Sequence, residues 1–142
     1  MAMTVTNMTF DCGDARALGE FWAAMTGWHV FFDDDPEVLV APHFPATGGT
    51  MLFIPVPEGK TAKNRLHLDL HPTDRTRDEA VDQALSLGAT IVGDHRKEDG
   101  GGWVTMADPE GNEFCVELSM AERTERAERS GASAVRSYRI GS

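Results

Sequence analysis

The first sixty residues carry hydrophobic patterns typical of strands and of one helix. Met8, Phe10 and Cys12 alternate with polar side chains, which predicts a half-buried strand with a polar second face. Asp14 is a suitable helix cap, and apolar residues then recur at i, i+3, i+4 and i+7 before Gly27, as in an amphipathic helix. This stripe consists of Leu18, Phe21, Trp22 and Met25. Three strand-like segments follow, separated by turns rich in proline and glycine, at residues 28–32, 38–41 and 50–56.

The same order of patterns recurs about sixty residues later. Leucines alternate with polar residues over 66–71, and Asp74 takes the place of Asp14. Thr76 and Glu79 form a capping-box pattern before a second helical stripe, which consists of Val81, Ala84 and Leu85 and ends at Gly88. Strand-like segments then cover residues 89–92, 103–106 and 114–118.

This duplication predicts an α+β fold built from two βαβββ modules. We expect one domain over residues 1–120, with module one at 3–57 and module two at 63–120, followed by a C-terminal extension at 121–142. In the extension, Glu122–Arg126 and Glu125–Arg129 have the i,i+4 spacing of a charged helix that ends at Gly131. Residues 134–140 form either a short added strand or a disordered end.

The polar faces of the two modules define a candidate binding surface. Each helix should bury its stripe on the apolar face of its own sheet, which leaves the polar faces to curve around an accessible cup. The side chains expected to line the cup are Asn7, Thr9, Asp11, His67, Asp69, His71, Cys115 and Glu117. Cys12 and Cys115 should lie on opposite faces, which argues against a disulfide between them.

Composition narrows the classes of partner. The 142 residues include 23 acidic and 13 basic ones, and the formal net charge of -10 repels nucleic acids and anionic membrane surfaces. The sequence has no signal peptide, no membrane-spanning apolar run and no C-x-x-C pair, so we expect a cytoplasmic protein. The partner that the expected cup favours is a small molecule.

Three stretches resemble the vicinal oxygen chelate superfamily, in particular its glyoxalase/bleomycin-resistance/dioxygenase-like members. They are DCGDARALGEFWAAMTGW at residues 11–28, KNRLHLDL at 63–70 and DPEGNEFCVEL at 108–118. The resemblance implies paired βαβββ modules that form a curved mixed sheet around a cup. In catalytic members a divalent metal sits in that cup, held by ligands from the first and last strands of each module.

The resemblance assigns two metal ligands in this chain, His67 and Glu117. These residue types suit Zn, Ni, Fe or Mn. The first module departs from the pattern, because Asn7 takes the first-strand position and residues 53–55 contain no acid, histidine or cysteine. We therefore expect no cofactor, and a divalent metal is the alternative.

The leading hypothesis is a binding protein that sequesters a small, planar or aromatic molecule. The candidate ligand-binding residues are Asn7, Thr9, Asp11, Asp69, Trp103 and Cys115. Trp103 follows three glycines, so it is either a stacking residue on a flexible rim or part of an edge-strand core. The alternatives are a metal-dependent lyase, isomerase or dioxygenase of the glyoxalase type, and a metal-free enzyme using His67 and Glu117 as acid and base. We also expect a homodimer, or a tightly fused pair of modules inside the monomer, because curved sheets leave edges that are usually covered.

Overall fold

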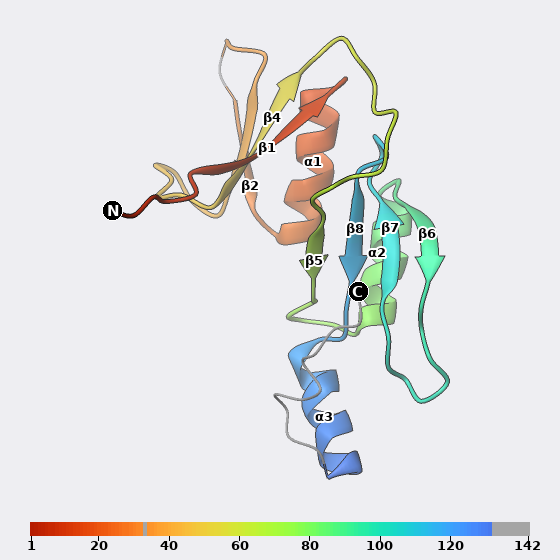
Figure 1. Cartoon of the computed structure of the whole chain (residues 1–142). Helices are drawn as coiled ribbons and strands as arrows, with labels where there is room; N and C mark the ends of the chain where they lie inside the picture. Colours follow the sequence, from red (N-terminus) through yellow and green to blue (C-terminus); the bar gives the residue numbers. More distant parts are fainter. Residues whose placement is uncertain (33, 132–142) are drawn as a thin grey trace. The chain divides into compact units, whose positions relative to one another are not determined.

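The computed structural model describes residues 1–32 and 34–131, which divide into two compact units, Met1–Ala62 and Lys63–Ser142. Each unit contains one strand, one helix and three further strands in that order (Figure 1). The predicted α+β class and the duplicated βαβββ pattern are therefore confirmed. The cup between the two modules stays a prediction.

The first unit is a four-stranded mixed sheet with one helix. Its elements are β1 (Asn7–Cys12), α1 (Ala15–Thr26), β2 (His29–Phe31), β3 (Val38–Ala41) and β4 (Thr50–Pro55), and the strand order is β1-β4-β3-β2. β1 and β4 are parallel, and the other pairs are antiparallel. The Asp14 side chain accepts a hydrogen bond from the backbone N–H of Ala17, and Gly27 ends the helix with a φ of 75°. Both predicted ends of this helix are confirmed.

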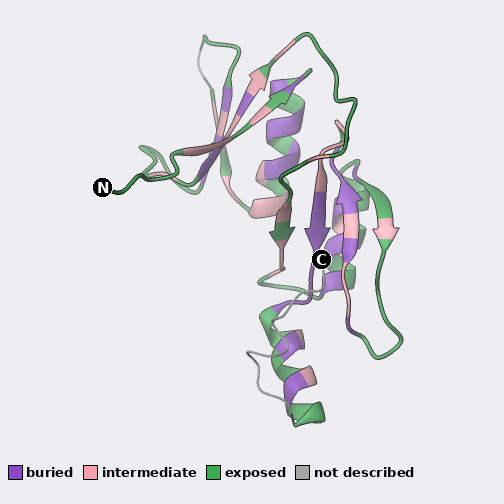
Figure 2. Cartoon of the chain, in the orientation of Figure 1, coloured by how far each residue is buried: buried purple, intermediate pink, exposed green. Residues whose placement is uncertain are grey.

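Leu18, Phe21 and Trp22 of the α1 stripe are buried on this sheet, as their spacing predicts, whereas Met25 is partly exposed. The Phe10 ring lies 5.6 Å from that of Trp22 and 5.0 Å from that of Phe53. Gly19 allows the close approach of helix to sheet, because a Cβ there would lie 2.8 Å from a methyl group of Val38. Figure 2 shows buried residues along α1 and the neighbouring strands.

The second unit repeats this topology. It comprises β5 (Leu68–Leu70), α2 (Arg77–Ser86), β6 (Thr90–Asp94), β7 (Val104–Ala107) and β8 (Glu113–Val116), with the strand order β5-β8-β7-β6. β5 and β8 are parallel, and the remaining pairs are antiparallel. The capping box of Thr76 and Glu79 is present, as predicted.

Two details of the second module differ from the sequence-based expectation. Hydrogen-bonded pairing of β5 with β8 begins only at Leu68, so the apolar alternation extends beyond the strand and Leu66 is 76% exposed. The α2 stripe is narrower than predicted, because Ala80, Val81 and Ala84 are buried whereas Leu85 is 41% exposed. Hydrophobicity marks the elements correctly but does not set their ends.

The helix predicted in the extension is α3 (Met120–Ser130), and Gly131 caps it with a φ of 68°. Glu125 and Arg129 form the predicted pair at 3.7 Å. The predicted pairing of Glu122 with Arg126 is wrong. Glu122 instead forms a capping box with Ser119, while Arg126 hydrogen-bonds Asp99. Residues 134–140 lie outside the described residues. None of the described helices is long and apolar enough to cross a membrane.

Candidate functional site

The open face of the first sheet carries three of the predicted binding residues. Cα partners in adjacent strands project to the same face, and Thr9, Leu52, Leu39 and Phe31 are successive partners across β1, β4, β3 and β2. The neighbouring row contains Phe10 and Phe53, which pack with Trp22 of α1. The row that begins at Thr9 therefore lies on the face away from α1, together with Asn7 and Asp11.

A pocket of about 480 Å³ opens on the apolar half of this face. The Phe31 and Phe44 rings lie 5.3 Å apart and tilted by 34°, and Phe44 is 66% exposed. The lining residues are Val30, Phe31, Phe32, Asp35, Glu37, Leu39, Phe44 and Leu52. Aromatic walls with two carboxylates suit a flat molecule that carries positive charge. Sequence reasoning missed this pocket, because its phenylalanines lie on a strand and in loops that approach one another only in the fold.

The polar half of the same face consists of β1 side chains. Oδ1 of Asn7 accepts a 2.6 Å hydrogen bond from the Thr50 hydroxyl, which fixes the orientation of this amide. Thr9 and Asp11 are exposed to solvent. The first sheet thus offers a polar strip on β1 beside an apolar pocket around β2 and β3.

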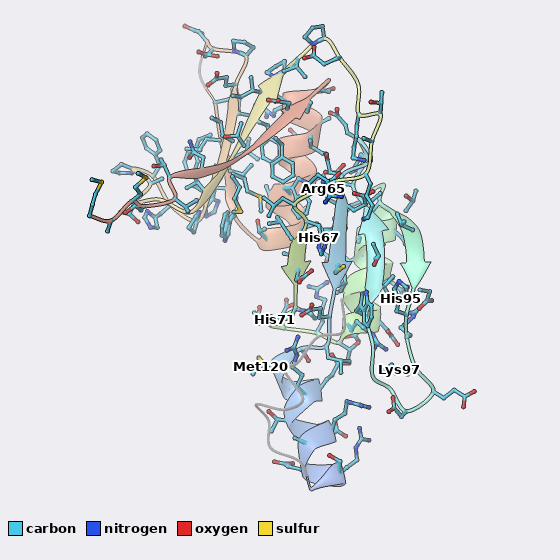
Figure 3. The ribbon with its side chains drawn as sticks, viewed as in Figure 1. Arg65, His67, His71, His95, Lys97 and Met120 are labelled. Atoms are coloured by element: carbon cyan, nitrogen blue, oxygen red, sulfur yellow. The ribbon has the colours of Figure 1, made fainter. Side chains whose placement is uncertain are left out.

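The second sheet brings together His67, Asp69 and Cys115. Asp69 and Cys115 are Cα partners in the parallel pair β5–β8, and Nδ1 of His67 lies 3.2 Å from Oδ1 of Asp69. Figure 3 shows His67 at the start of β5. The Cys115 Sγ lies 3.5 Å from the Thr105 hydroxyl, and burial raises the pKa of this thiol. Cys12 and Cys115 form no disulfide.

Glu117 lies in a different environment from the one predicted. Its side chain is 6% exposed, and Oε2 accepts a 2.8 Å hydrogen bond from Arg123 of α3. Burial raises the pKa of this carboxyl, and the Arg123 guanidinium opposes that shift. Among the described residues, Oε1 of Glu117 is buried without a hydrogen-bond partner. Within residues 1–32 and 34–131, the carboxylate beside His67 is that of Asp69, and Glu117, the other candidate acid–base residue, pairs with Arg123.

The metal arrangement implied by the family does not fit these residues. A guanidinium already neutralises Glu117, so a divalent cation there would meet a buried positive charge. Asn7 offers an amide oxygen that Thr50 already engages, and Phe53 is wholly buried in the core. The first and last strands of module one therefore supply no strong ligand.

Trp103 has a partner within its own unit. Its ring stacks on His95 at 4.7 Å with an interplanar angle of 26°. The preceding glycines are held in place, because one Arg77 nitrogen lies 2.8–3.3 Å from the carbonyl oxygens of Gly100, Gly101 and Gly102. These hydrogen bonds connect the glycine segment to α2, and stacking of Trp103 on a ligand stays a prediction. No sequence signal distinguishes the buried Arg77 and Arg123 from exposed arginines.

Several solved structures share this fold. Among solved structures, a glyoxalase/bleomycin resistance protein/dioxygenase family enzyme from Burkholderia phytofirmans is 15% identical, with a TM-score of 0.61 over 80% of this chain and 97% of that chain. The fosfomycin resistance protein FosX from Mesorhizobium loti is 14% identical, with a TM-score of 0.63 over 87% and 98%. FosX from Listeria monocytogenes, in complex with Mn(II) and a dihydroxypropylphosphonic acid, is 13% identical, with a TM-score of 0.64 over 92% and 99%.

At these identities the similarity to solved structures shows the fold alone. Among curated protein sequences, none matches the chain. The family model described as a glyoxalase-like domain matches residues 7–117, which include both βαβββ modules. The chain therefore belongs to the glyoxalase-like domain family of the vicinal oxygen chelate superfamily.

Proposed function

We propose that this protein binds and sequesters a small, flat aromatic cation on the open face of its first sheet. The observation that carries the proposal is the pocket of about 480 Å³ lined by Phe31, Phe32 and Phe44, with Asp35 and Glu37 among its lining residues. Pockets of this size accommodate drug-sized ligands. Binding by this face requires no metal and no chemical step.

Stacking and charge both favour such a ligand. An aromatic pair contributes about 0.5–1.5 kcal/mol beyond the area it buries, and Phe44 is exposed enough to close over a bound ring. Arg16 lies over the Phe32 ring at 3.9 Å from its centroid, and this contact supports binding of a planar cation by the same type of interaction. The net charge of -10 also attracts cationic molecules.

The β1 residues would complete the site. Because Thr9 and Leu52 are neighbours on one face, a ligand longer than the pocket would reach Thr9 and then Asn7 or Asp11. These polar groups would bind the heteroatoms of the ligand and so supply specificity.

Isothermal titration with two flat probes of opposite charge tests the proposal. Proflavine, a planar cation, should bind, and 9-anthracenecarboxylate, a planar anion, should not. The substitution Phe44→Ala should weaken proflavine binding by about tenfold, equivalent to about 1.4 kcal/mol. Glu37→Gln should weaken proflavine binding less than Phe44→Ala does, because Asp35 remains among the lining residues.

Matched controls are available on the same chain. Leu66 is an exposed apolar residue outside the pocket, and Glu58 is an exposed acid outside it. Leu66→Ala and Glu58→Gln should leave proflavine affinity unchanged. Equal affinities for the two probes, or a Phe44→Ala variant that binds as the wild type does, would reject the proposal.

Acid–base catalysis by His67 is a second candidate. A carboxylate at Nδ1 orients an imidazole so that Nε2 exchanges protons with a substrate, and the His67 side chain is 35% exposed. Structural neighbours include fosfomycin resistance proteins and a lactoylglutathione lyase. Incubation with fosfomycin or lactoylglutathione, with and without Mn(II), tests this candidate. Turnover lost in His67→Gln but kept in His71→Gln would support it, and no turnover of either compound would count against it.

We further propose that the protein is a cytoplasmic homodimer. β6 is an edge strand of the second sheet, and its side chains Ile91 and Val92 are 42% and 58% exposed. An exposed apolar edge strand of this kind presents unpaired backbone groups with which another chain can pair. Sedimentation equilibrium should give twice the 15.5 kDa chain mass, and Val92→Lys should shift the protein toward monomer. A wild-type monomer at micromolar concentration would contradict the dimer.

A further inference from the structure

The second unit carries a group of metal-binding side chains that differs from the one implied by the family resemblance. One donor atom each from His67, Asp69 and Cys115 lies within 4.8 Å of the other two. The convergence follows from strand register, because Asp69 faces Cys115 across β5–β8 and His67 precedes Asp69 by two positions, on the same side. All three residues belong to the Lys63–Ser142 unit, whereas the aromatic pocket belongs to Met1–Ala62.

The donor chemistry is that of zinc. Imidazole nitrogen, carboxylate oxygen and thiolate sulfur bind Zn²⁺ at about 2.0–2.3 Å, so ligand atoms around a tetrahedral ion lie about 3.5 Å apart. The separation of Nδ1 of His67 from Oδ1 of Asp69 is already 3.2 Å. Small side-chain rotations would bring all three donor atoms, which lie within 4.8 Å of one another, to a bonding distance from one ion.

The surroundings also suit an ion. The His67 and Asp69 side chains are each 35% exposed, so a hydrated cation and a water ligand have access from solvent. The Thr105 hydroxyl is placed to donate a hydrogen bond to the sulfur. Asp69 and a Cys115 thiolate together carry two negative charges, which balance a divalent ion.

We propose that His67, Asp69 and Cys115 form a binding site for Zn²⁺, with water as the fourth ligand. This site leaves Glu117 with Arg123, so the ion avoids the buried guanidinium. Thiolate favours zinc over manganese or magnesium, which sets the expected metal preference.

Cobalt(II) titration of metal-free, reduced protein tests the site, because a cobalt–thiolate bond gives a strong near-ultraviolet charge-transfer band. One equivalent of Co²⁺ should produce the band, and one equivalent of Zn²⁺ should remove it. The band should disappear in Cys115→Ser and persist in Cys12→Ser, because Cys12 lies in the other unit. A wild-type protein without the band, or loss of the band in Cys12→Ser instead, would overturn the proposal.

A second variant tests the site even if Cys115→Ser fails to fold. Asp69 is partly exposed, so Asp69→Asn should keep the circular dichroism spectrum of the wild type. It should weaken Zn²⁺ binding by more than about tenfold in competition with a chromophoric chelator. His71→Gln serves as the matched control for His67→Gln. Unchanged zinc affinity in both Asp69→Asn and His67→Gln would exclude the site, and the proflavine titration is independent of this result.

Discussion

The Arg123 guanidinium donates a 2.8 Å hydrogen bond to Oε2 of Glu117, and the two side chains are only 2% and 6% exposed. Arg123 also donates to the carbonyl oxygen of Leu118 at 3.0 Å. Helix α3 thus supplies the cation that neutralises the carboxylate of the residue directly after β8. The C-terminal helix therefore contributes one member of a buried ion pair in the second unit, although it follows the repeated βαβββ pattern in sequence.

Removal of Arg123 should destabilise the protein strongly. Arg123→Met would leave the Glu117 carboxylate buried and uncompensated, which typically costs about 3–5 kcal/mol. Urea unfolding followed by circular dichroism measures the change. Arg129→Met is the control, because the Arg129–Glu125 pair is exposed and such pairs contribute less than about 1 kcal/mol.

The double variant Arg123→Met with Glu117→Leu distinguishes the cost of an unpaired carboxylate from the cost of lost packing by the arginine stem. Replacement of both charges by apolar groups is often neutral or stabilising, so most of the lost unfolding free energy should return. If the double variant is as unstable as Arg123→Met alone, the loss arises from packing of the arginine stem and not from the unpaired carboxylate.

Gly102 should tolerate no side chain. Its φ is +82°, and a Cβ there would collide with the carbonyl oxygen of His95. Gly102→Ala should lower the unfolding free energy by at least about 2 kcal/mol. Gly59 has a negative or extended φ and open space around it, so Gly59→Ala should change stability by less than about 0.5 kcal/mol. Equal stability of the two variants in urea unfolding would contradict this reading of the loop.

Arg77 should hold the glycine segment against local opening. Its side chain is 5% exposed and contacts the carbonyl oxygens of all three glycines. Arg77→Met should therefore speed hydrogen exchange at the amide of Lys97, which bonds Gly101 across the loop. The Thr50 amide in the first unit is the internal reference, and a parallel increase there would indicate global unfolding instead.

Asp94 should titrate far below an ordinary aspartate. Hydrogen bonds from Arg96 lower its pKa from 3.8 to about 2. Because the folded-state pKa is depressed, the stabilisation is complete above pH 3.8 and is lost as the pH falls toward 2. Carbon-detected NMR should show this midpoint, and Arg96→Gln should raise it toward 3.8, with the backbone N–H of residue 96 still holding it below that value. A normal midpoint in the wild type would show that the pair does not persist in solution.

The sequence by itself determined the order of elements and their faces. Period-two and period-3.6 patterns marked both modules, because one face of each strand and one stripe of each helix must leave water. Local capping chemistry set helix starts at Asp14 and Thr76 and a helix end at Gly27, since those bonds form between residues close in sequence. The same reasoning found the helix before Gly131.

Tertiary structure alone decided which polar groups meet. Glu117 pairs with Arg123 and His67 with Asp69, although the residue types allowed His67 with Glu117. Trp103 stacks on His95, and Phe31 joins Phe44 across a turn to wall the pocket. These contacts depend on strand register and on long side chains that reach across loops, neither of which leaves a periodic signal in the sequence. Burial patterns therefore predict an α+β fold, whereas the partners of its charges and aromatic rings are fixed only when the chain packs.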